Sequence, residues 1–209
     1  MRTEDRFDEL ICTEEQLRAV VGFPTPRAVN KTIARLDEHC RTIISGSPFV
    51  VVSSSDASGR TDVSPRGGRC GFVLVLDERT LAIPDRPGNR RADTFSNVLQ
   101  NPHVGLLFLI PNRKETLRVR GRASIVRDLG LRRRLAAGEK LPELALVVAV
   151  DEAFVHCGKC ILRARLWDPV AWPDVERLPT HAQCLVDQAQ LDESVETVHR
   201  EVQESYRNL

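Results

Sequence analysis

Two neighbouring stretches, Val104–Ile110 (VGLLFLI) and Thr116–Val126 (TLRVRGRASIV), decide the fold class. The first is an unbroken apolar run of the length of a buried strand. The second alternates strictly: one face carries Leu117, Val119, Gly121 and Ala123, and the other carries Thr116, Arg118, Arg120 and Arg122. This period of two is typical of a strand with one buried and one exposed face.

Further strands are predicted on both sides of this pair. Phe49–Val52, the turn Asp56–Gly59 and Thr61–Pro65 form one hairpin, while Phe72–Leu76 and Thr80–Pro84 form another around Asp77-Glu78-Arg79. Leu144–Val150 adds a strand. Successive hairpins with few crossover helices favour an antiparallel barrel of about six strands with added helices, an α+β fold, over a doubly wound parallel sheet.

Helices are predicted at both ends of the chain and before the buried strand. Thr13 and Gln16 form a capping box that begins a helix ending near Val21. A second helix is predicted from apolar residues at helical spacing, which are Val29, Ile33, Leu36, Cys40, Ile43 and Ile44. Three further helices are predicted at Asn89–Gln100, Asp128–Gly138 and His181–Tyr206. The expected division is an N-terminal helical cover (1–46), a barrel domain (47–170) and a C-terminal helical extension (171–209).

Composition excludes several classes of protein. The chain has 209 residues, 42% of them hydrophobic, and 30 Lys and Arg against 29 Asp and Glu, for a net charge of +1. This balance provides no overall field for nucleic acid or an anionic membrane. The longest apolar run is shorter than the ~20 residues of a membrane helix, and the N-terminus does not resemble a signal peptide. We therefore expect a cytoplasmic protein with free thiols.

Common cofactor and metal motifs are missing from the sequence. It has no GxGxxG, GxxxxGK[ST], GxSxG or HExxH motif. Cys157 and Cys160 form a CxxC pair, but no second pair completes four zinc ligands, so no metal site is expected. A redox dithiol and two ordinary cysteines both remain open interpretations.

Three polar stretches are candidates for ligand binding. Asp85–Arg91 joins a strand end to a helix start with three arginines, which suits a phosphate, although these arginines also have Asp85 and Asp93 as partners in a solvated turn. Asp62–Gly68 ends a strand with a hydroxyl, a cation and two glycines, or is a surface turn. The third is the arginine face of Thr116–Arg122, which solvent alone also explains.

Taken together, these stretches resemble the FMN-binding split β-barrel proteins of the pyridoxamine 5'-phosphate oxidase-like family. The resemblance runs from about Ser47 to Pro169 and lies in seven motifs, which are Ser47–Phe49, Asp62–Gly67, Gly71–Val73, Ile83–Arg91, Asn101–Phe108, Glu115–Gly121 and Arg163–Pro169. It implies a six-stranded barrel that forms a homodimer with FMN at the subunit interface.

The resemblance also assigns roles to residues. Arg66, with Val63, Ser64 and Pro65, would run along the flavin and its ribityl chain. The loop that would grip the phosphate comprises Asp85, Arg86, Pro87, Asn89, Arg90 and Arg91. Thr116 and Arg118 would reach the isoalloxazine ring, and Arg165 and Trp167 would close the cleft. No catalytic acid or base is assigned; His156 and Cys157 are the titratable side chains near the expected cleft.

The C-terminal segment departs from the oxidases that act on pyridoxamine phosphate, which end in a strand bearing arginine and histidine. The chain is closer to an uncharacterised bacterial branch with a Phe-His-Cys-x-Lys segment before Arg163–Pro169. The leading hypothesis is an FMN-dependent oxidoreductase of unknown small-molecule substrate. The alternatives are a flavin-binding protein without turnover, and the same barrel holding a deazaflavin or haem.

Overall fold

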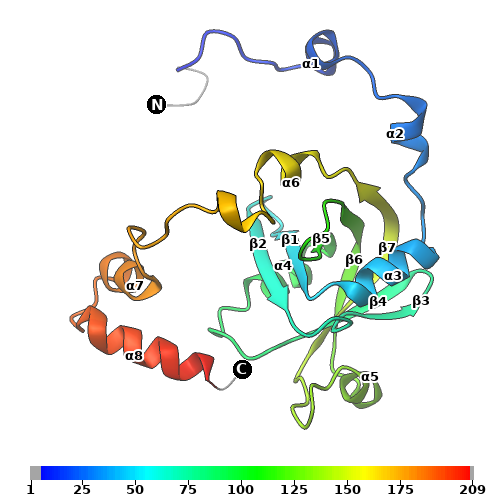
Figure 1. The fold of residues 1–209 in the computed structure, drawn as a ribbon. Helices are drawn as coiled ribbons and strands as arrows, with labels where there is room; N and C mark the ends of the chain where they lie inside the picture. The colour runs from blue at the N-terminus through cyan, green and yellow to red at the C-terminus, as the bar shows by residue number, and fades with distance from the viewer. Residues whose placement is uncertain (1–5, 208–209) are drawn as a thin grey trace. The chain divides into compact units, whose positions relative to one another are not determined.

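The fold is a single antiparallel sheet accompanied by helices (Figure 1). It is seen in a computed structural model that describes residues 6–207. The strands are β1 (Phe49–Ser55), β2 (Thr61–Gly67), β3 (Leu74–Asp77), β4 (Thr80–Pro84), β5 (His103–Leu109), β6 (Thr116–Val126) and β7 (Ala145–His156). The helices are α1 (Glu14–Val21), α2 (Pro26–Asn30), α3 (Glu38–Gly46), α4 (Asp93–Gln100), α5 (Leu129–Arg134), α6 (Lys159–Arg163), α7 (His181–Ala189) and α8 (Val195–Tyr206), with a 3-10 turn η2 at Pro169–Ala171.

The sheet has seven strands in the order β2-β1-β5-β6-β7-β4-β3. Every neighbouring pair is antiparallel, which confirms the class predicted from the hairpins. The expected count of about six was too low, because each extended segment forms its own strand. The sheet is also open: in the described chain β2 and β3 are its two edges, so no ladder closes it into a ring.

The turn between β1 and β2 is held by a single carboxylate, as its sequence suggested. Asp56 Oδ1 accepts hydrogen bonds from the Ser58 amide at 2.8 Å and from the Arg60 amide at 3.0 Å. Its Oδ2 accepts from Arg60 Nε at 2.7 Å. The Ser58 and Arg60 hydrogen bonds hold the pKa of Asp56 below its usual range, because they stabilise the ionised form. This Asx-type turn sets the register of β1 against β2.

The two longest strands, β6 and β7, join the two halves of the sheet. β6 pairs with β5 on one side, and β7 pairs with β4 on the other. Their mutual ladder shifts register between Arg120 and Gly121, where β7 contributes an extra residue. A Cβ at Gly121 would lie 2.1 Å from the carbonyl oxygen of Ala149, so the close approach of these strands requires glycine.

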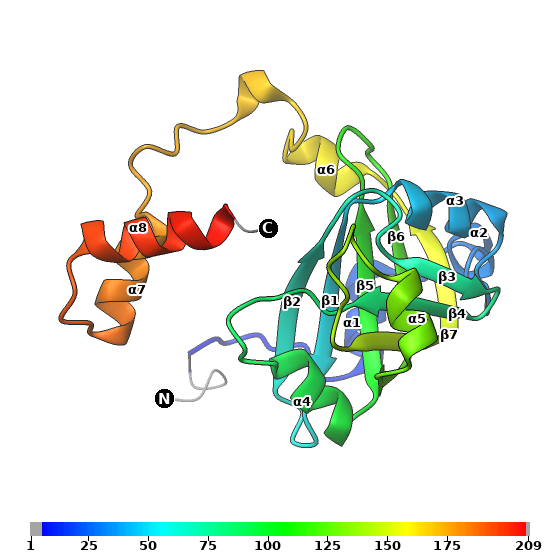
Figure 2. The ribbon, with the colours of Figure 1, turned by 90° about the horizontal axis from the view of Figure 1, so that it is seen from below.

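The core lies on one face of the sheet and is covered by two helices. α3 packs against β3, β6 and β7, while α4 packs against β1, β2 and β6 (Figure 2). α3 buries Cys40, Ile43 and Ile44, and α4 buries Thr94 and Val98. The largest side chains of the core come from the strands and include Phe108, Leu81, Ile83, Leu117, Val50, Val52, Val119 and Val148.

The prediction of one continuous helix from Val29 to Ile44 was wrong. Residues after Asn30 leave the helix, and Ile33 forms a bridge with Ala153 of β7, with N···O distances of 3.0 and 2.7 Å. A new helix begins only after Asp37, whose side chain accepts from the Cys40 amide at 2.8 Å. Ile33 and Leu36 are apolar because they cover the sheet, which helical spacing alone does not reveal.

Other boundaries also differ from their predictions. β7 continues to His156, six residues beyond the predicted end at Val150. α4 begins at Asp93 instead of Asn89, because Arg90 and Ala92 have left-handed φ values of 62° and 58°. α5 stops at Arg134. The predicted C-terminal helix is divided into α7 and α8, since Gln190 also adopts a left-handed conformation with φ 51°.

The chain divides into two compact units, Met1–Trp167 and Asp168–Leu209. The first contains the sheet. The second contains η2 and the pair α7–α8, whose contact buries Ala182 and Val198. Among residues 6–207, no helix combines the length and the apolar character needed to span a membrane.

The bulge yields a prediction about stability. Gly121→Ala should lower the free energy of unfolding by about 2 kcal/mol or more, because its methyl group overlaps backbone that cannot rotate away. Gly88→Ala is the matched control, since a Cβ there meets only the Arg86 carbonyl oxygen at 3.9 Å. Urea unfolding measures both. Equal stability of the Gly121→Ala variant and the wild type would contradict the close approach.

Candidate functional site

Arg66 on the edge strand β2 is fixed by a small hydrogen-bond network beneath α4. Its Nη2 donates to Thr94 Oγ1 at 3.1 Å, and its Nη1 donates to Ser64 Oγ and, at 2.9 Å, to the Pro65 carbonyl. Thr94 Oγ1 in turn donates to Asp62 Oδ2 at 3.0 Å. Thr94 is buried, so the guanidinium position is set from inside the fold.

The strand pleat explains this grouping. Side chains of β2 alternate between half-buried and exposed, and Asp62, Ser64 and Arg66 share the half-buried face. Arg66 lies opposite Val50, a core residue, in the β1–β2 register. Val63 and Pro65 therefore face the other way, and Val63 is 65% exposed.

The loop 85–91 approaches the same network from β4. The Asp85 amide donates to the Leu144 carbonyl at 2.9 Å. Burial raises the pKa of Asp85, against an opposing effect of the nearby Arg66 charge. Arg86 Nη2 donates to the Leu135 carbonyl at 3.1 Å, and burial lowers the pKa of this guanidinium.

The remainder of the loop is exposed at the start of α4. The Arg91 amide donates to Asn89 Oδ1 at 3.1 Å, and Arg91 Nε pairs with Asp93 Oδ2 at 2.7 Å. Pro87 and Arg90 are also exposed. No side chain caps α4, because its N-cap residue is Ala92. The structure thus places Arg90 and Arg91 just before an uncapped helix start, where Arg66 contacts Thr94, whereas Arg86 donates to Leu135 beyond α5. We call Arg66, Arg90 and Arg91, with Asp62, Ser64 and Thr94, the β2–α4 group.

Thr116 and Arg118 belong to a second group on the opposite face of the sheet. Arg118 lies opposite Leu107 and Phe154 in register, and its guanidinium carbon is 5.2 Å from the centroid of the Phe154 ring. Thr116 is buried and lies opposite His156. Lys31 also approaches Phe154, with Nζ 4.9 Å from the ring centroid. We call Lys31, Thr116, Arg118, Phe154 and His156 the Phe154 group.

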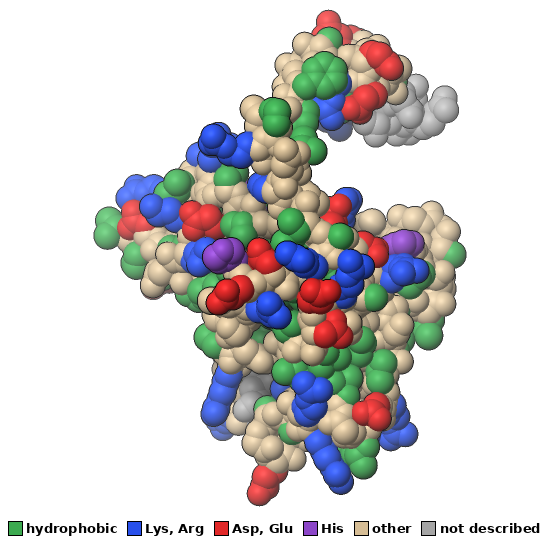
Figure 3. Space-filling model, turned by 90° about the vertical axis from the view of Figure 1, so that its right-hand side faces the viewer, with side chains coloured by type: hydrophobic (Ala, Val, Ile, Leu, Met, Phe, Trp, Pro, Cys, Tyr) green, Lys and Arg blue, Asp and Glu red, His purple; other side chains and the backbone are tan. Residues whose placement is uncertain are grey.

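The other arginines of β6 are paired with acids. Arg120 Nη2 lies 2.6 Å from Glu152 Oε1, and Arg122 Nε lies 4.0 Å from Asp151 Oδ1. Figure 3 shows one side of the molecule, on which basic and acidic side chains are interleaved with apolar ones. Two of the three arginines on this face of β6 therefore have acidic partners on the neighbouring strand β7.

The predicted closing residues lie apart from the β2–α4 group. Trp167 Nε1 donates to the Arg113 carbonyl at 2.9 Å, which ties it to the loop between β5 and β6. Arg165 is exposed and left-handed, with φ 48°.

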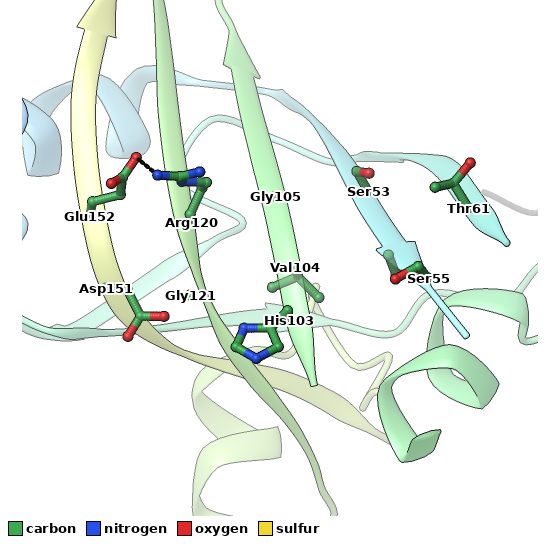
Figure 4. A pocket seen from close by; sticks show the side chains of 11 residues that line it. Ser53, Ser55, Thr61, His103, Val104, Gly105, Arg120, Gly121, Asp151 and Glu152 are labelled. Carbon is green, nitrogen blue, oxygen red and sulfur yellow. Dashed lines mark ion pairs between the residues drawn. The ribbon is translucent and has the colours of Figure 1, made fainter. Parts of the chain in front are cut away.

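A pocket of about 400 Å³ crosses β1, β5, β6 and β7 (Figure 4). Gly105 and Gly121 form part of its lining beside serines of β1. The Arg120–Glu152 ion pair borders it (Figure 4). The lining residues are Ser53, Ser54, Ser55, Thr61, His103, Val104, Gly105, Arg120, Gly121, Asp151 and Glu152. None of the residues predicted to hold a cofactor lines it.

Two residues of these groups, Thr94 and Lys31, were not among the predicted site residues. Thr94 lies three residues after the arginine-rich loop, so its closeness to that loop was a usable signal. Lys31 had no such signal, because only the bridge between Ile33 and Ala153 brings it to Phe154. Within residues 6–207, no three His, Cys, Asp or Glu side chains cluster as metal ligands.

Solved structures to which this chain is similar include HupZ of Group A Streptococcus, at 17% identity and a TM-score of 0.47, covering 57% of this chain and 92% of that one. General Stress Protein 26 from Bacillus anthracis is 18% identical with a TM-score of 0.43, covering 55% and 88%. An FMN-binding protein from Syntrophomonas wolfei is 13% identical with a TM-score of 0.42, covering 55% and 86%. The comparison with curated proteins found no match.

The sequence model of the family described as pyridoxamine 5'-phosphate oxidase matches residues 36–157. This range contains all seven strands, the loop 85–91 and both sides of the β6–β7 pair. Because the match covers more than half of the 209 residues, the chain belongs to the pyridoxamine 5'-phosphate oxidase family.

Proposed function

We propose that two copies of this chain bind FMN between them and use it in an oxidoreductase reaction on a small molecule. The observation that carries the proposal is the division of the expected flavin residues between the two faces of the sheet. Arg66 shares the face of Val50, whereas Arg118 shares the face of Leu107. A single ligand contacts both groups most easily when each of two subunits contributes one of them.

The β2–α4 group suits the phosphate and ribityl end of FMN. A phosphate carries negative charge, and it is favoured at an uncapped helix N-terminus with arginines beside it. Arg90 and Arg91 are exposed there, while Arg66 is already oriented by Ser64 and Thr94. Asp85, Arg86, Pro87 and Asn89 complete the loop. β2 is an edge strand, so the backbone at Val63 and Pro65 lies along a free sheet margin where a ring edge can bind.

The Phe154 group suits the ring. Thr116 and Arg118 of the second subunit would donate toward the isoalloxazine, and a cation there stabilises negative charge on reduced flavin. Arg165 and Trp167 would lie at the rim of the cleft. When bound, FMN supplies the hydride or electron transfer, while the chain binds, orients and shields it.

The proposal also assigns a role to each part of the chain. We infer that residues 47–170 form the FMN-binding part, with 1–46 and 171–209 as helical additions. The exposed apolar side chains Phe49 and Val63 lie on the sheet face that the dimer would cover. No residue of the two groups is assigned as a general acid or base.

The first of two predictions from this proposal concerns the cofactor and its phosphate. The purified protein should show flavin absorbance, and Arg90→Ala combined with Arg91→Ala should weaken FMN binding about tenfold or more, because two charged donors are lost. Riboflavin, which has no phosphate, should bind the variant and the wild type equally. Isothermal titration of flavin-free protein measures both ligands.

Arg133→Ala with Arg134→Ala is the control, since these exposed arginines lie on α5. Three results would contradict the assignment: a Soret band in the purified protein, preference for a deazaflavin, or an unchanged FMN affinity of the Arg90/Arg91 variant. Substrate-dependent bleaching of the bound flavin would separate an enzyme from a binding protein.

The second prediction tests the shared site. Light scattering should show a dimer, and Arg66→Ala and Arg118→Ala should each weaken FMN binding in homodimers. In a heterodimer of the two variants, one site combines both substitutions and the other has neither, so one wild-type site per dimer should return. If each site lay within a single subunit, every site would carry one substitution and no wild-type affinity would reappear.

A further inference from the structure

Phe154, near the end of β7, has cations from two different segments at its ring. Lys31 Nζ lies 4.9 Å from the ring centroid and Arg118 Cζ lies 5.2 Å from it. Arg118 comes from β6, the neighbour of β7 in the sheet, whereas Lys31 follows α2 at the other margin of β7. Cation–π contact keeps both charges close to a half-buried surface.

Lys31 is held in this position by backbone contacts. The Ile33–Ala153 bridge fixes the segment along β7, and Lys31 Nζ donates to the Val155 carbonyl at 2.9 Å. This segment precedes the range matched by the family, which begins at residue 36. Lys31 therefore lies outside the part of the chain that the family model matches.

Lys31 and Arg118 differ from the neighbouring arginines of β6 in having no acidic partner in the described part of the chain. Arg120 and Arg122, two and four residues along β6, pair with Glu152 and Asp151. Arg118 makes no ion pair with any residue in the described part of the chain, and neither does Lys31. Both are exposed, so their charges face solvent next to Phe154.

His156 brings a third nitrogen-bearing side chain to the same place. Its ring centroid lies 6.2 Å from that of Phe154. The pKa of His156 is lowered, first by burial and then by the positive charges of Arg118 and Lys31. These two cations, from β6 and from the N-terminal segment, are the charged groups that act on it. An anion bound here would reverse this effect, since it favours the protonated imidazole.

We propose that Lys31, Arg118 and His156 form a binding site for the carboxylate or phosphate group of the small molecule that exchanges electrons with the flavin. The inference deepens the proposed function, because Arg118 would lie between the flavin ring and this site. Lysine supplies a mobile point charge and arginine a planar fork, a combination suited to either oxyanion. The phosphate of FMN itself is assigned to the β2–α4 group, on the other sheet face.

The test uses the full chain without flavin and follows the His156 ring by NMR, with the signal assigned from a His156→Gln variant. Inorganic phosphate and acetate are the two probes. Saturable binding of either should raise the pKa of His156, and the stronger probe identifies the preferred group. Lys31→Gln should raise the pKa of His156 before any anion is added and weaken anion binding about three- to fivefold.

Lys31→Arg should retain anion binding, because it keeps the charge, and Lys140→Gln, far along the sequence in an exposed turn, should behave as the wild type. No saturable shift with either probe, or an unchanged affinity in Lys31→Gln, would overturn the site. Weaker binding of FMN but not of riboflavin by Lys31→Gln would also overturn it, by showing that the cluster holds the flavin phosphate.

Failure of this site and failure of the proposed function give different results. The anion titration needs no flavin, so it succeeds or fails independently of FMN binding. Conversely, an unchanged FMN affinity of the Arg90/Arg91 variant leaves the His156 titration unaffected.

Discussion

The ladder between β6 and β7 is the interaction on which the rest of the structure depends. It joins the strands β2, β1 and β5 to the hairpin β3–β4, and without it the sheet would be two separate pieces. β7 has one extra residue opposite the step from Arg120 to Gly121 in β6, and beyond that point the other set of β7 side chains faces outward. The outward row before the bulge contains Arg118, Phe154, Arg120 and Glu152, which is where the charges and the aromatic ring meet. A glycine is required at the bulge because backbone of β7 occupies the space of its side chain.

The pleat of the sheet then determines what a single copy of the chain can do. Edge strand β2 directs Ser64 and Arg66 toward α4, while β6 directs Arg118 to the opposite face. A net charge of +1 conceals this arrangement, since some arginines are neutralised across β7 and others stand at the uncapped start of α4. The net charge therefore does not show where the arginines lie or which acids they meet, since Arg91 pairs with Asp93 at the start of α4 while Arg120 pairs with Glu152 across the sheet.

The N-terminal segment shows how a local pattern can be misread. Ile33, Leu36 and Cys40 have the spacing of a helical face, yet Ile33 pairs with β7 through its backbone and a helix begins only at Glu38. Apolar spacing reports which residues are covered, and both a helix and an extended segment lying on a sheet can satisfy it. The extended conformation is selected by hydrogen bonds to Ala153, which is distant in sequence, and it is this choice that carries Lys31 to Phe154.

By itself the sequence determined the strands, the antiparallel class of the sheet, most turns and the resemblance to the family, because alternation, turn residues and helix caps act over a few neighbouring positions. It also singled out Arg66, the loop 85–91 and Arg118 as candidates, since their residue types and order match a family pattern. Only the tertiary structure decided the open edges of the sheet, the extension of β7 to His156, the pairing of Arg120 and Arg122 with acids, and the position of Lys31 beside Phe154. These features depend on which backbone groups and charges meet across the sheet, and such contacts join positions that no local pattern connects.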